Sequence, residues 1–100
     1  MSTFITTFEK GSEEYEKLQI AALMLTNRSP RGYQYHVGTT YFDFGQDWKW
    51  TTILCNGEDN IYQALNPREQ EEIILSDTYD EMVKTVELIF TDKFCPDKKD

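Results

Sequence analysis

The chain has 100 residues, of which 39% are hydrophobic and 28% charged, and its 18 acidic and ten basic side chains give a formal net charge of -8. This length and composition fit one globular domain over residues 1–100 with a modest core, and they exclude disordered, collagen-like and disulfide-dense proteins. The net charge also argues against direct binding of nucleic acid, because phosphates repel an acidic surface.

The first quarter of the chain predicts a short strand followed by a helix. Residues 3–9 are rich in Phe, Ile and Thr, which favour strands. Ser12 then suits a helix N-cap, with acidic residues in the first turn where the helix dipole favours negative charge. Apolar residues at helical spacing predict a helix over 13–26, although the apolar run 20–25 leaves a strand as the alternative.

A strand with aromatic residues on both of its faces is expected next. Tyr33, Tyr35 and Val37 alternate with polar residues, which is the period of a half-buried strand. Beyond Gly38 the large apolar residues change parity. A bulge or bend near that glycine accounts for the change.

Two further strands complete a predicted antiparallel meander over 33–65. Residues 48–55 alternate as a strand does, and Asn56-Gly57 is a dipeptide typical of hairpin turns. The strand after this turn covers 61–65. We expect these two strands to pair antiparallel with each other.

Two helix-start signals follow the meander. Asn66 as N-cap, Pro67 in the first turn and a glutamate three residues after the cap predict a short helix over 67–75. A second cap at Thr78 begins the most regular amphipathic pattern of the chain, which predicts a helix over 79–94.

Together these elements predict an α+β fold. A small antiparallel sheet, made of the meander over 33–65 with an N-terminal strand over 3–9, is packed on one side by the helices over 13–26 and 79–94. One helical layer covers only one face of a sheet, so some aromatic side chains of the meander should lie on the surface or at an interface.

The sequence carries no signature of catalysis or of a cofactor. His36 is the only histidine, the two cysteines, Cys55 and Cys95, fit no metal-binding spacing, and the chain has no phosphate-binding glycine loop. The apolar run 20–25 is far shorter than the ~20 residues that span a bilayer. We therefore expect a cytoplasmic protein that is not an enzyme, has reduced thiols, and binds no cofactor, metal or membrane.

Acidic and aromatic side chains are the candidates for partner binding. In a chain of this net charge, clustered carboxylates create a negative field that steers a basic protein partner. Aromatic side chains are enriched where binding energy concentrates. The candidates are Glu69, Glu71, Glu72, Asp77, Asp80, Tyr41, Phe42 and Phe44.

The expected function is that of a small acidic intracellular protein-binding module. An inhibitor or immunity-type protein of a phage or mobile element would occupy a basic or nucleic-acid-binding site on its partner, and a DNA mimic is a sharper form of this hypothesis. One alternative is a small-molecule-binding domain with a pocket lined by Tyr35, Trp48, Trp50 and Tyr62. The other is a structural homodimer formed through an open sheet edge.

Overall fold

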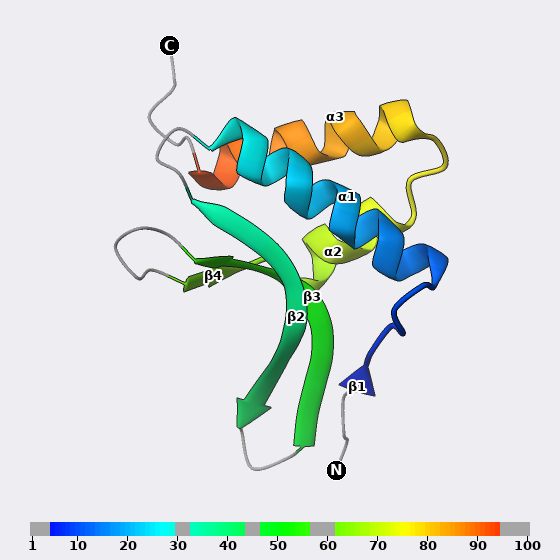
Figure 1. The fold of residues 1–100 in the computed structure, drawn as a ribbon, viewed down its shortest axis with the longest axis vertical. Coiled ribbons are helices and arrows are strands. Elements are labelled where there is room, and N and C mark those ends of the chain that lie inside the picture. The colour runs from blue at the N-terminus through cyan, green and yellow to red at the C-terminus, as the bar shows by residue number, and fades with distance from the viewer. Residues whose placement is uncertain (1–4, 30–32, 44–46, 57–61, 95–100) are drawn as a thin grey trace.

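A computed structural model describes residues 5–29, 33–43, 47–56 and 62–94 and has an α+β fold (Figure 1). The helices lie together against one side of a small sheet. In chain order the elements are β1 (Ile5–Thr6), α1 (Glu13–Arg28), β2 (Gln34–Asp43), β3 (Asp47–Asn56), β4 (Tyr62–Ala64), α2 (Pro67–Ile74) and α3 (Tyr79–Ile89), which continues into a π-helical turn (Phe90–Phe94).

β3 is the central strand of the sheet. It pairs antiparallel with β2 along its whole length on one side. On the other side it pairs antiparallel with β4, through Leu54 and Ala64, and parallel with β1, through Trp50 and Thr6. The predicted meander and its hairpin pairing are confirmed, and the N-terminal strand is shorter than expected. Residues 57–61, which hold the rest of the predicted turn, lie outside the described residues.

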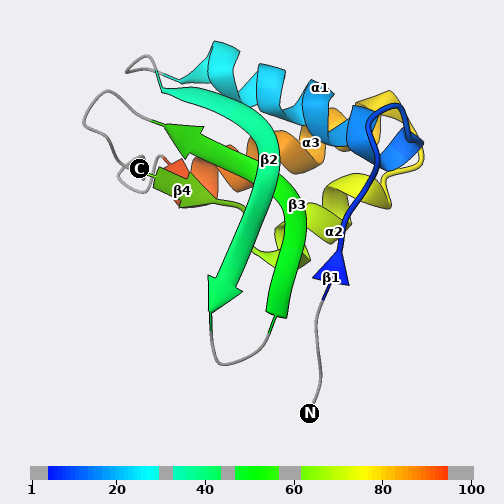
Figure 2. The same ribbon diagram turned by 60° about the horizontal axis from the view of Figure 1, so that its bottom comes forward.

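Of the bulge or bend expected near Gly38, the bulge is wrong. Each residue of β2 faces one residue of β3 without interruption, from Gln34 opposite Asn56 to Asp43 opposite Asp47. The two strands instead curve together (Figure 2). A Cβ atom on Gly38 would lie 3.1 Å from Leu54 Cδ1, so the glycine leaves room for that side chain.

β3, the partner of β2, is buried on both of its faces. Ile53 and Cys55 belong to the core beneath the helices. Trp50 and Thr52, which point to the opposite face because side chains alternate along a strand, are buried as well. Apolar residues at either parity are therefore compatible with an unbroken ladder.

The core lies between α1 and the face of the sheet that it covers. α1 packs on β2 and β3, while α2 and α3 pack on α1 and on each other. The apolar run 20–25 is helical, so the strand alternative for it is wrong. The buried members of the core are Leu18, Ala21, Ala22, Met24, Leu25, Tyr35, Ile53, Cys55, Leu65, Ile73, Met82, Val86 and Ile89.

Each predicted helix cap is present. Tyr15 N–H donates to the Ser12 side chain at 3.2 Å, and Glu81 N–H donates to the Thr78 hydroxyl at 3.1 Å. These bonds satisfy backbone donors that the first turn of a helix leaves without a partner. Within the described ranges, no helix combines the length and apolar character required to cross a membrane.

Candidate functional site

The structure brings some of the predicted binding residues together and separates others. Glu69 and Glu72 line a common groove, whereas Glu71, Asp77 and Asp80 are exposed and do not line it. For the three aromatic candidates, side-chain positions lie outside what the structure describes. Tyr41 and Phe42 belong to β2 by their backbone, and Phe44 falls in 44–46, beyond the described residues.

The groove lies between α2 and the C-terminal end of α3, and has a volume of about 450 Å³. Its walls carry three carboxylates and one guanidinium, which leave a formal charge of -2. The residues that line it are Asn66, Arg68, Glu69, Glu72, Leu88, Ile89 and Asp92.

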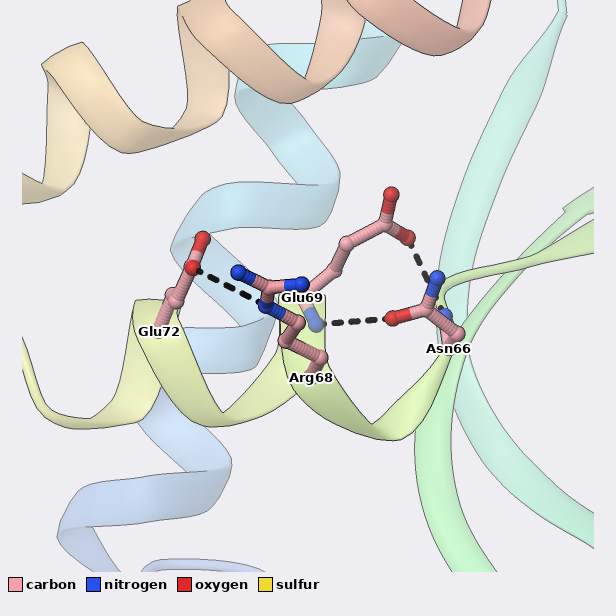
Figure 3. A network of polar contacts seen from close by, with 4 residues as sticks. All are labelled: Asn66, Arg68, Glu69 and Glu72. Atoms are coloured by element: carbon pink, nitrogen blue, oxygen red, sulfur yellow. Dashed lines mark hydrogen bonds and ion pairs between the residues drawn. The ribbon is translucent and has the colours of Figure 1, made fainter.

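The capping box of α2 positions the first of these carboxylates. Glu69 N–H donates to Asn66 Oδ1 at 2.9 Å, and Asn66 N–H donates back to Glu69 Oε1 at 3.1 Å (Figure 3). This reciprocal pair holds the Glu69 side chain over the N-terminus of α2. Glu69 thus has a defined orientation although it lies at the surface.

Arg68 opposes the acidic character of the groove only weakly. Its Nε lies 3.8 Å from Glu72 Oε2, one helical turn further along α2 (Figure 3). The Arg68 side chain is 87% exposed, and an exposed pair of this kind contributes roughly 0–1 kcal/mol. Glu72 is therefore held only loosely by Arg68.

The apolar part of the groove comes from α3. Ile89 is buried in the core, whereas the neighbouring Leu88 is 71% exposed and presents apolar surface to the groove. Sequence reasoning missed Leu88 and Asp92. Their signal was present only in part, as a leucine off the apolar face and an aspartate one turn later on the helix predicted over 79–94.

A second groove, of about 650 Å³, runs between α1 and β2 and has a different character. Its lining contains no Asp, Glu, Lys or Arg side chain and consists of Gln19, Ile20, Ala22, Leu23, Thr26, Gln34, Tyr35, His36 and Val37. His36 is exposed on β2, as its position in the alternating pattern predicts.

The small-molecule pocket suggested by the sequence does not form from those of its four residues whose side chains are described. Tyr35 pairs with Cys55 across the sheet and belongs to the core under α1. Trp50 has the opposite parity and points to the other face. These two side chains therefore do not line one cavity, and the side chains of Trp48 and Tyr62 are not described.

Buried Cys55 has the character of a structural thiol. Desolvation raises the pKa of this thiol, and a hydrogen bond with the Tyr35 side chain opposes the rise. The protonated form is a poor nucleophile and a poor metal ligand. Over the described part of the chain, no three His, Cys, Asp or Glu side chains are placed to share a metal ion.

Comparison with known proteins gives no relative from which a function can be transferred. No protein-family model, no curated protein and no solved structure matches the chain.

Proposed function

We propose that this chain is a small acidic protein-binding module and that the groove between α2 and the end of α3 binds a basic segment of a partner protein. The observation that carries the proposal is the combination in that groove of three carboxylates, Glu69, Glu72 and Asp92, with the exposed apolar side chain of Leu88.

The chemistry of the groove matches a lysine or arginine side chain better than an isolated ion. Such side chains join an aliphatic stem to a cationic head, and they bury the stem on apolar surface while the head remains near polar groups. Leu88 offers contact to the stem. The capped carboxylate of Glu69 and the loosely paired carboxylate of Glu72 accept hydrogen bonds from the head.

Charges outside the groove support the same class of partner. Three further acidic side chains are exposed: Glu71 on α2, Asp77 in the connection that follows it, and Asp80 on α3. At low salt, a field of one sign raises the rate at which a partner of opposite sign associates. A partner whose basic site normally takes nucleic acid has the required charge, which is the basis for proposing an inhibitor or immunity-type role.

A synthetic basic peptide provides a direct test. A peptide of about ten residues that alternates arginine and leucine is titrated into isotopically labelled protein, and amide shifts are followed by NMR; an otherwise identical glutamate–leucine peptide is the control. We expect shifts concentrated at 66–72 and 88–92 with the basic peptide only. Shifts elsewhere, or equal response to both peptides, would exclude this groove.

A matched pair of variants separates the groove from the general charge of the protein. The triple variant Glu69→Gln, Glu72→Gln, Asp92→Asn and the triple variant Glu71→Gln, Asp77→Asn, Asp80→Asn remove the same number of charges. Gln at position 69 preserves the capping box. We expect the first variant to weaken peptide binding by about tenfold and the second by less than about threefold. Equal losses would assign binding to net charge alone.

A further inference from the structure

β2 forms an edge of the sheet that lacks the usual protection against pairing. Among the described strands it pairs only with β3, which leaves its other side open. Its ten residues contain no lysine, arginine, glutamate or proline, and the one acidic residue, Asp43, is at its end. Proteins commonly protect an open edge with a lysine, a proline, a bulge or a covering helix. This strand has none of the first three, and α1 bonds to its outward backbone at Tyr35.

A hydrogen bond from β2 to α1 identifies the backbone groups that face the open edge. Tyr35 N–H donates to the Thr26 hydroxyl of α1 at 2.9 Å, so the backbone of Tyr35 points away from β3. Alternate residues of an antiparallel strand point to opposite neighbours. The N–H and C=O groups of Val37 and Thr39 therefore also point outward, and on that side they bond to no described residue.

Apolar side chains of α1 lie beside this edge. Ile20 is 38% exposed and Leu23 61% exposed, and both line the uncharged groove of about 650 Å³ between α1 and β2. The open backbone edge and this apolar groove form one continuous surface that includes Val37.

We propose that a second copy of this chain occupies that surface. The β2 strands of the two copies pair antiparallel about a twofold axis at Gly38, so that Val37 of each copy exchanges main-chain hydrogen bonds with Thr39 of the partner subunit. The same axis places the exposed flanks of the two α1 helices over neighbouring parts of an extended sheet. Such an interface is self-complementary, as twofold symmetry requires.

Charge is the reason to choose a second copy over a foreign basic segment. The groove lining contains no carboxylate, so it gives a basic partner no ion pair. Two chains of net charge -8 repel each other over most of their surface, and this uncharged face is where they can approach closely. Because Tyr35 already bonds to Thr26, the part of β2 open to pairing is shorter than its ten residues. With the flank of α1 it reaches only the low end of specific interfaces, roughly 1,000 Å² in total. We therefore expect a dimer with a dissociation constant of tens to hundreds of micromolar.

Sedimentation velocity over about 1–500 µM protein tests the proposal, with salt as the second variable. Raising salt from about 50 to about 300 mM screens the repulsion between like-charged copies and should strengthen the dimer several-fold. The same change weakens binding of a basic peptide to the acidic groove. The two proposals thus respond to salt with opposite sign, and either can fail without the other.

Two variants and one matched control locate the interface. Thr39→Pro removes an outward N–H that makes no hydrogen bond to β3. Leu23→Lys places a charge on the flank of α1. Each variant should raise the dissociation constant of the dimer at least about tenfold. Leu75→Lys is the control, because Leu75 is 68% exposed, similar to Leu23, and does not line this groove. It should leave the dissociation constant unchanged. Circular dichroism confirms that each variant is folded. A chain that stays monomeric at about 500 µM and high salt, or a dimer that both variants leave intact, would overturn the proposal.

Discussion

The ammonium group of Lys17 donates a hydrogen bond to the backbone carbonyl of Ile74 at 2.9 Å and thereby joins the first helix to the end of the second. The same ammonium donates to the Ser76 carbonyl. Ile74 is the last residue of α2 and Ser76 follows the C-cap, so the ammonium lies at the end of the helix, where carbonyl groups have no partner within the helix and the dipole favours a cation. A residue that reads as a surface lysine in the sequence is thus a cap supplied from a distant element.

Replacing Lys17 with methionine should lower the free energy of unfolding by about 1–2 kcal/mol, because charge-assisted hydrogen bonds to these carbonyls are lost while the aliphatic stem remains. Urea titration measures the change. Lys10→Met is the control, since Lys10 is exposed and makes no such contact in the described structure. Similar effects at both positions would show that the cap contributes nothing.

The apolar face of α3 gives a second stability prediction. Val86 is 0% exposed and lies in the core, whereas Lys84 is exposed on the same helix. Val86→Ala should lower the free energy of unfolding by about 1–3 kcal/mol through the cavity it leaves, and Lys84→Ala should change it by less than about 0.5 kcal/mol. Equal changes in urea titrations would mean that the face of the helix is wrongly assigned.

Gly11 is the third position at which a single substitution should be informative. Its φ angle of 93° lies in the region that residues with a side chain rarely adopt, and it immediately precedes the cap of α1. No atom lies within 4 Å of a Cβ built there, so any loss of stability would come from the backbone conformation alone. Gly11→Ala should lower the melting temperature through a loss of about 1 kcal/mol. An unchanged melting temperature would contradict this.

The Cys55 thiol predicts a dependence of stability on pH. Burial raises its pKa in the folded state above the usual value of 9.0, so the unfolded chain loses the proton first as the pH rises. The stability that the protonated thiol contributes is complete below the pKa of the unfolded chain. It is lost as the pH rises toward the pKa of the folded protein. Cys55→Ala should therefore show a smaller fall in the free energy of unfolding between about pH 8 and pH 10 than the native protein.

That comparison uses only the slope with pH, because the cavity left by the alanine lowers stability equally at every pH. Identical slopes for the two proteins would show that the thiol does not ionise differently in the folded and unfolded states. The native thiol should also react slowly with a disulfide reagent at about pH 8 until urea exposes it.

His36 provides a negative control for the acidic groove. It is exposed on β2 and lines the uncharged groove beside α1. His36→Ala should leave the affinity for the arginine–leucine peptide within about twofold of the native value. A larger loss would move peptide binding away from α2 and α3 toward the sheet edge.

Local signals in the sequence were sufficient for the elements and for their order. Ser12, Asn66 and Thr78 each bind the backbone of the turn that follows, and the pairing of β3 with β4 depends on alternation in two neighbouring segments. These interactions join residues a few positions apart, so composition and spacing predict them.

Tertiary structure alone decided which of these elements share a surface. The unbroken register at Gly38 belongs to the pairing of β2 with β3 along its whole length, which no period within β2 reveals. The acidic groove requires the end of α3 to lie beside α2, and it joins Asp92 to Glu69 across two helices. Long-range packing sets that proximity, whereas the sequence pattern reports only which face of each helix is apolar.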